Sequence, residues 1–158
     1  MKRIKFILAA ATLLLFGGCG TVLKTTIDRE TKSMEQSYEI IAQGDYPADM
    51  ALYNAKEATA QSFRSDIPAQ KEAFEVLYER LTAERAPVYE GTMVVVTMGT
   101  QSTGGYGYEI TAVEIYPDAS ALKLKKIAPA GLATTALTNP YLILSLPKSY
   151  GKTEIVIE

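Results

Sequence analysis

The stretch after Pro87 most constrains the fold, because five segments with strand character follow one another there without helical periodicity. The first is rich in β-branched residues, the middle ones alternate apolar and polar side chains, and turn-forming residues separate all five. The segments are TMVVVTMG, YGYEITAVEIY, ALKLKKIA, PYLILSLP and TEIVIE. This succession predicts an antiparallel sheet curled into a sandwich or a small barrel.

The second of these segments contains a break in its alternation. Tyr108 and Ile110 share one face with Ala112, whereas Val113 and Ile115 fall on the other. A β-bulge resets such a pattern, so we expect one within this strand.

The part before Pro87 contributes one amphipathic helix, predicted over about residues 67–84. Pro68 suits the first helical position, and Ser65 or Asp66 is placed to cap the helix. One apolar stripe at helical spacing is expected to face the core, and it comprises Phe74, Leu77, Tyr78 and Leu81.

Two upstream segments, YEIIAQGDY and ATAQSFRS, are candidate strands, the first of them at a sheet edge. The fold class is therefore α+β, mainly β, with a single domain over residues 38–158 and a strand-rich part over residues 88–158.

The N-terminus has the pattern of a secretory signal peptide, which we assign to residues 1–18. Basic residues precede an apolar run at positions 6–16, which is shorter than the roughly 20 residues that span a bilayer. Two glycines lead to Cys19, the only cysteine, which resembles the lipid-modified cysteine of bacterial lipoproteins. The alternative is a plain secretory signal followed by an unmodified thiol. Residues 19–37 are then the lipidated cysteine and a polar, flexible tether.

Charge argues against a nucleic-acid partner. The whole chain has a formal net charge of −2, and loss of Lys2, Arg3 and Lys5 with the signal peptide lowers it to −5. Nucleic-acid binding needs a basic face, and an anionic lipid surface does not attract an acidic domain. Membrane attachment is expected to come from lipid on Cys19, which places the protein in the bacterial cell envelope, at the outer membrane or cell surface.

The residues offer little for catalysis. The chain has no histidine, so the usual activation of a serine or cysteine nucleophile is missing. STGGYG lacks the lysine and the following helix of a phosphate loop, and no acidic cluster has calcium-loop spacing. SLPK matches a serine–lysine motif in letters, but Pro147 opposes the helical turn that this chemistry needs. We expect a non-catalytic binding protein without a metal or cofactor.

The stretch TQSTGGYGYEI, residues 100–110, has two interpretations. In the first, Gly104 and Gly105 supply positive φ angles in a hairpin between the two strands that flank them. In the second, Tyr106 and Tyr108 beside glycine and serine form a binding loop. A second loop of small residues, APAGLATTALTNPY at residues 128–141, is expected to join it along one interaction edge.

Both loops resemble the PrcB C-terminal domain family, over about residues 89–148. The family pattern is an apolar strand ending in glycine, a TGGY turn, an alternating strand, and an ALT-small-PY segment that leads to LPK. The residues that carry the resemblance are Thr103, Gly104, Gly105, Tyr106, Asn139, Pro140 and Tyr141. With Tyr108 they are the candidate protein-binding residues. The resemblance implies a non-catalytic accessory that binds or stabilises a subtilisin-like protease at the bacterial surface.

Two other functions stay open at this point. The TGGY turn is also similar to the TGY loop of chagasin-type inhibitors, which are β domains that block papain-like proteases. A structural envelope lipoprotein with no protease partner, or with another envelope protein as its partner, is the third possibility.

The N-terminal pattern predicts that Cys19 carries the membrane anchor. The substitution Cys19→Ala removes the thiol that would be lipidated, so the protein is expected to move from the membrane fraction to the soluble fraction. Fractionation of cells by ultracentrifugation measures this, and a variant that still sediments with membranes would contradict the anchor.

Overall fold

The computed structural model of the chain describes residues 38–158. The predicted signal peptide, Cys19 and the tether lie outside these residues, so the structure does not test them. The elements within the described part are β1 (Glu39–Gly44), α1 (Met50–Tyr53), β2 (Thr59–Arg64), α2 (Pro68–Thr82), β3 (Thr92–Thr97), β4 (Gly107–Ile115), β5 (Ala119–Ile127), β6 (Tyr141–Leu146) and β7 (Lys152–Ile157). None of the helices in residues 38–158 has the length and hydropathy of a membrane span.

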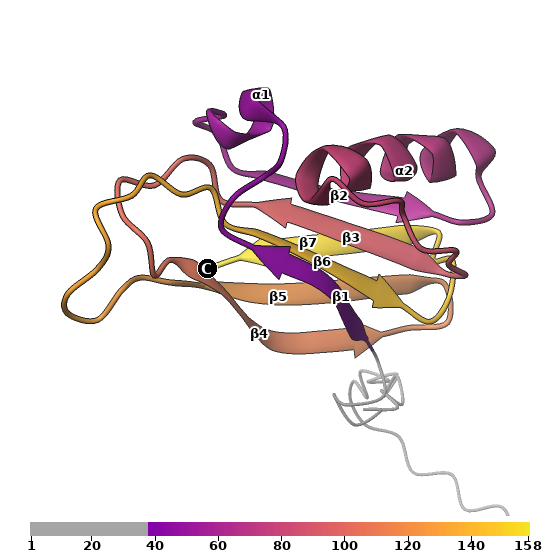
Figure 1. Cartoon of the computed structure of the whole chain (residues 1–158). Helices are drawn as coiled ribbons and strands as arrows, with labels where there is room; N and C mark the ends of the chain where they lie inside the picture. Colours follow the sequence, from indigo (N-terminus) through magenta and orange to yellow (C-terminus); the bar gives the residue numbers. More distant parts are fainter. Residues whose placement is uncertain (1–37) are drawn as a thin grey trace, which may run out of the picture.

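The strands form two sheets that pack face to face, and α2 makes a third layer (Figure 1). The first sheet has the antiparallel order β1-β6-β3-β2, and the second has the order β4-β5-β7. The sheets do not close into a barrel. The prediction of an α+β fold that is mainly β, with a sandwich of sheets and one amphipathic helix, is confirmed.

One strand pair departs from the expected antiparallel pattern, because β5 and β7 are parallel. The strand β6 ends at the edge of the sandwich where β5 begins, and only residues 147–151 separate it from β7. So short a connection crosses to the second sheet at that same end. β7 must therefore start beside Ala119 and run in the direction of β5.

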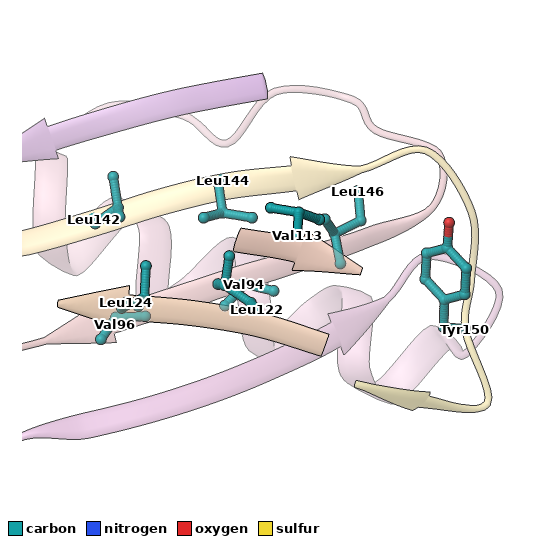
Figure 2. Close-up of a cluster of buried hydrophobic side chains, with 9 residues drawn as sticks. All are labelled: Val94, Val96, Val113, Leu122, Leu124, Leu142, Leu144, Leu146 and Tyr150. Carbon is teal, nitrogen blue, oxygen red and sulfur yellow. The ribbon is translucent and has the colours of Figure 1, made fainter. Parts of the chain in front are cut away.

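The first sheet is buried on both faces. Successive side chains of its central strands β3 and β6 point to opposite sides, so each strand contributes to both buried clusters. Val94 and Val96 contribute to the cluster between the two sheets, whereas Met93 and Val95 pack under α2. Figure 2 shows the inter-sheet cluster, with Tyr150 at one end; its members are Val94, Val96, Val113, Leu122, Leu124, Leu142, Leu144, Leu146 and Tyr150. A strand that is apolar at nearly every position, as VVV indicates, is what a doubly covered sheet requires.

The helix α2 covers the other face of the first sheet with the expected stripe. Phe74, Tyr78 and Leu81 are buried, and Leu77 packs against the same cluster, so this prediction is confirmed. The ring of Phe74 lies 5.0 Å from that of Tyr89 and 5.8 Å from that of Phe63, measured between centroids.

The start of α2 differs from the prediction in its cap. Pro68 is the first helical residue, but the N-cap position is Ile67, which has no side-chain cap. Asp66 instead pairs with Arg64 at 2.6 Å, and the Ser65 hydroxyl accepts a hydrogen bond from the Gly91 amide at 2.9 Å. Both polar side chains therefore bond to residues at the end of β2 or just before β3, which explains why neither caps the helix.

The strand β4 contains the predicted bulge, as its pairing with β5 shifts register between Ile110 and Ala112. Because of the bulge, side chains on both sides of it in the sequence face the inter-sheet cluster. Tyr108 and Ile110 do so before the bulge, and Val113 and Ile115 do so after it.

The predicted hairpin between β3 and β4 is wrong. β3 is hydrogen-bonded to β6 on one side and β2 on the other, so no edge of it is free for β4. The connection over residues 98–106 instead carries the chain from one sheet to the other.

The three-layer arrangement predicts different costs for two substitutions on α2. Phe74 is fully buried and Val76 is 55% exposed. Phe74→Ala is expected to lower the free energy of unfolding by about 3–5 kcal/mol, since it leaves a cavity between α2 and the sheet. Val76→Ala should change it by about 0.5 kcal/mol or less. Urea denaturation measures both, and equal costs would contradict the packing described here.

Candidate functional site

The two loops singled out from the sequence lie together at one end of the sandwich (Figure 1). We call residues 98–106 and 128–140 the paired loops. Gln101 and Thr138 exchange backbone hydrogen bonds of 2.7 and 3.1 Å, and the Thr138 hydroxyl donates to the Thr103 carbonyl at 2.8 Å. The Gly104 amide donates to the Thr134 carbonyl at 3.1 Å. These bonds make one structural unit of segments that are more than 20 residues apart in the sequence.

The two central glycines of the paired loops have different reasons to be glycine. Gly105 has a φ of +87°, which side chains other than glycine rarely adopt. Gly104 does not have a positive φ, contrary to the prediction, but it is buried against Thr134. A Cβ atom on Gly104 would lie within 2.4 Å of the Thr134 hydroxyl oxygen, so this position is closed to a side chain by the second loop.

A third segment, residues 45–58 with the short helix α1, supports the paired loops from one side. The Asn139 side-chain amide donates to the Leu52 carbonyl at 2.7 Å and to the Ala55 carbonyl at 3.3 Å. The Thr100 amide also donates to the Ala55 carbonyl, and the Tyr53 hydroxyl donates to the Leu137 carbonyl at 2.7 Å. Each loop is therefore bonded both to the other loop and to this segment.

The helix α1 is in turn fixed to the end of α2 through Asp49. This residue caps α1 by accepting hydrogen bonds from two backbone amides, and its carboxylate pairs with Arg80 at 2.9 Å. The hydrogen bond from Arg80, with the backbone amides as a smaller cause, lowers the pKa of the Asp49 carboxyl to about 2. Asp49 is thus ionised at neutral pH and holds the supporting segment against the helical layer.

Beside the paired loops lies a groove of about 390 Å³. It runs between the end of β1, the start of β4 and the start of β6, and its lining residues are 43–45, 105–108, 140–142 and Ile127. Five of the eight candidate residues line it, namely Gly105, Tyr106, Tyr108, Pro140 and Tyr141. The structure therefore brings the two sequence motifs to one surface feature.

The other three candidates lie behind the groove. Thr103 and Gly104 bond to the second loop through their backbones, and Asn139 is only 1% exposed. These residues hold the paired loops in place and do not face a partner.

The three tyrosines in the groove differ in the contacts that they make with the rest of the fold. The Tyr108 hydroxyl donates to the Thr97 carbonyl at 3.2 Å, and burial raises the pKa of this phenol, so it remains a neutral donor. Burial also raises the pKa of the Tyr141 phenol, and Tyr141 packs against the cluster under α2. Tyr106 is half-buried and makes no side-chain hydrogen bond or ring contact with any residue in the range 38–158.

Sequence reasoning missed the six other lining residues, which are Gln43, Gly44, Asp45, Gly107, Ile127 and Leu142. Asp45 follows an edge strand in the letters GDY, a common turn composition that carries no signal of a site. Its place in the groove depends on the pairing of β1 with β6, in which Gly44 lies opposite Tyr141. Long-range pairing of this kind could not be derived from a single sequence.

The described residues offer no metal centre, since no group of three or more potential ligands gathers within 38–158. Ser145 lies within strand β6 and Lys148 beyond its end, so the two do not share a helical turn. A second hollow, of about 520 Å³, lies between α2 and β2 and is lined by residues such as Phe63, Val76 and Leu77. It contains none of the candidate binding residues.

The fold defines a class of β-sandwich domain with one helical layer and a groove at one end of the sandwich. The predicted family is confirmed by comparison with known families. Residues 92–147 match the model of the PrcB C-terminal family. The match runs from the start of β3 to just past the end of β6, so it includes both of the paired loops. No curated protein and no solved structure matches the chain.

The geometry predicts that Asn139 and Tyr106 contribute to different properties. Asn139→Ala removes two hydrogen bonds to the supporting segment, each of which is worth about 1 kcal/mol. We expect it to lower the free energy of unfolding by about 2 kcal/mol or more. Tyr106→Ala removes a side chain that the fold does not use for hydrogen bonding, so its cost should stay below about 1 kcal/mol.

Thermal and urea unfolding of the two variants, measured side by side, checks this assignment. A Tyr106→Ala variant that unfolds as readily as the Asn139→Ala variant would show that Tyr106 is part of the core.

Proposed function

We propose that the chain is a non-catalytic envelope lipoprotein that binds another protein through the groove and the paired loops. The partner proposed is a subtilisin-like surface protease, of which this chain is an accessory or stabilising subunit. The observation that carries the proposal is the convergence of the family-matched motifs on one groove, at which the Tyr106 side chain has no hydrogen bond or ring contact within residues 38–158.

The position of the groove relative to the N-terminus supports this proposal. In the β1–β6 pair, Glu39 lies opposite Ser145 and Gly44 lies opposite Tyr141. The described chain therefore begins at the end of β1 that is away from the groove (Figure 1). An anchor at Cys19 would thus be attached through the end of the domain opposite the groove and would leave the groove open to a surface protein.

Rigid support of the loops is a second reason to propose binding. Loops that are already ordered lose less conformational entropy when a partner binds, and this favours affinity. The paired loops are cross-linked by backbone bonds and fixed by Asn139, so their shape is set before any partner arrives.

Capture of the partner tests the proposal. The full-length protein, tagged at its C-terminus and crosslinked in the native envelope, is expected to co-purify with a protease. Tyr106→Ala should reduce the yield of that protease about tenfold or more, since tyrosine anchors at interfaces commonly cost about 2 kcal/mol on truncation. The matched control is Tyr116→Ala, which makes the same change after the far end of β4.

Activity of the captured protease separates the three candidate functions. An accessory subunit leaves the protease active, and its loss lowers the amount of active enzyme. A chagasin-type inhibitor lowers the activity of a papain-like protease in stoichiometric amounts. A structural lipoprotein yields no protease at all, and that result would overturn the proposal.

A further inference from the structure

We infer that the groove receives a basic side chain, best an arginine, from an extended segment of the partner. This inference rests on the proposed function, because it names the chemistry that the same groove recognises. It is drawn from the charge, the aromatic lining and the strand edges at this place.

The charge in the groove is the carboxylate of Asp45, which has no ion-pair partner among residues 38–158. Two other aspartates of the domain are paired, Asp49 with Arg80 and Asp66 with Arg64. The backbone carbonyl of Asp45 accepts a hydrogen bond from the Asn139 amide at 2.8 Å. A buried residue therefore fixes the backbone of Asp45 at the groove, while the carboxylate has no ion-pair partner within residues 38–158 and is available to a cation from outside.

The lining beside Asp45 suits the flat guanidinium group. Tyr106 and Tyr108 contribute aromatic rings, over which a guanidinium group binds when it comes within about 6 Å of the ring centre. Gly107, which lies between them in the sequence, also lines the groove and has no side chain, and a Cβ atom added there would meet nothing within 4 Å. Arginine combines stacking on aromatic rings with bidentate pairing to a carboxylate, which lysine does not.

The ends of two edge strands flank the groove. β1 is the terminal strand of the first sheet and β4 is the terminal strand of the second. The groove touches β1 at Gln43 and Gly44, and β4 at Gly107 and Tyr108. Extended peptides bind to such edges through main-chain hydrogen bonds, while pockets beside the edge select alternate side chains. The groove is then the pocket that selects one side chain of the bound segment.

The overall charge favours the same kind of partner. Without the basic residues of the predicted signal peptide the chain has a formal charge of −5, so its field attracts basic segments. Lys126 lies opposite Tyr108 across the β4–β5 pair, but it does not line the groove.

The test is a binding measurement with defined peptides. The probe is a seven-residue peptide with a central arginine between serine and valine residues, and its counterpart has citrulline, which keeps the shape but lacks the charge. The isotope-labelled full chain, held in detergent micelles, is titrated with each peptide and followed by NMR. We expect the arginine peptide to bind about tenfold more tightly than the citrulline peptide in 50 mM salt, with the preference shrinking as salt is raised.

Two variants show whether the preference for the arginine peptide depends on Asp45. Asp45→Asn should abolish the difference between the peptides, because it removes the charge and keeps the size of the side chain. Asp118→Asn removes one carboxylate at the opposite end of the domain, between β4 and β5, and should retain the difference. Equal binding of the two peptides, no binding of either, or equal effects of the two variants would overturn the inference.

The outcomes also separate this inference from the proposed function. If protease capture depends on Tyr106 but not on Asp45, the groove binds a partner without a basic side chain and only the inference fails. If the arginine preference is found but no protease is captured, the groove retains its specificity and the proposed partner is wrong. Binding of a glycan or of a second copy of the chain would appear as capture that neither peptide competes away, and would count against the inference.

Discussion

Burial of the first sheet on both faces is the constraint on which the rest of this structure depends. β3 and β6 lie in the middle of that sheet, with α2 on one side and the second sheet on the other. Neither strand can slip by one residue, because a slip would exchange the side chains that face the helix for those that face the second sheet. The register of β6 against β1 and β3 is thereby fixed, and with it the positions at which the first of the paired loops begins and the second ends.

Asn139 transmits that constraint to the groove. It precedes β6 by two residues, and its backbone and side chain bond to Asp45 and to the segment around α1. Most residues that line the groove lie at the ends of strands β1, β4, β5 and β6, so their positions follow from the two sheets. The proposed recognition surface is thus placed on a rigid scaffold, where its geometry does not have to be created on binding.

The sequence predicted those features that depend on local pattern. The strand-rich part, the stripe of α2 and the bulge of β4 follow from spacing within single segments, and all are present. The features that it did not predict depend on which segments meet. The hairpin failed because β3 already has two partners, and the cap of α2 failed because Ser65 and Asp66 bond to neighbouring chain ends. The sequence did not indicate Asp45 for the same reason, because its place in the groove depends on the pairing of β1 with a strand almost a hundred residues away.

Edge protection along β4 explains why recognition would concentrate at one end of this strand. An exposed edge invites pairing with other chains, and proteins limit this with bulges and charged side chains. The bulge of β4 lies beyond Ile110, and the charged residues of the strand are Glu109 and Glu114, of which Glu114 pairs with Lys123 at 3.2 Å. Only Gly107 and Tyr108, the first two residues of the strand, precede both devices, and both line the groove. An extended partner would therefore pair with β4 at the groove but not along the rest of its edge. The same strand would thus limit aggregation and direct binding to the groove.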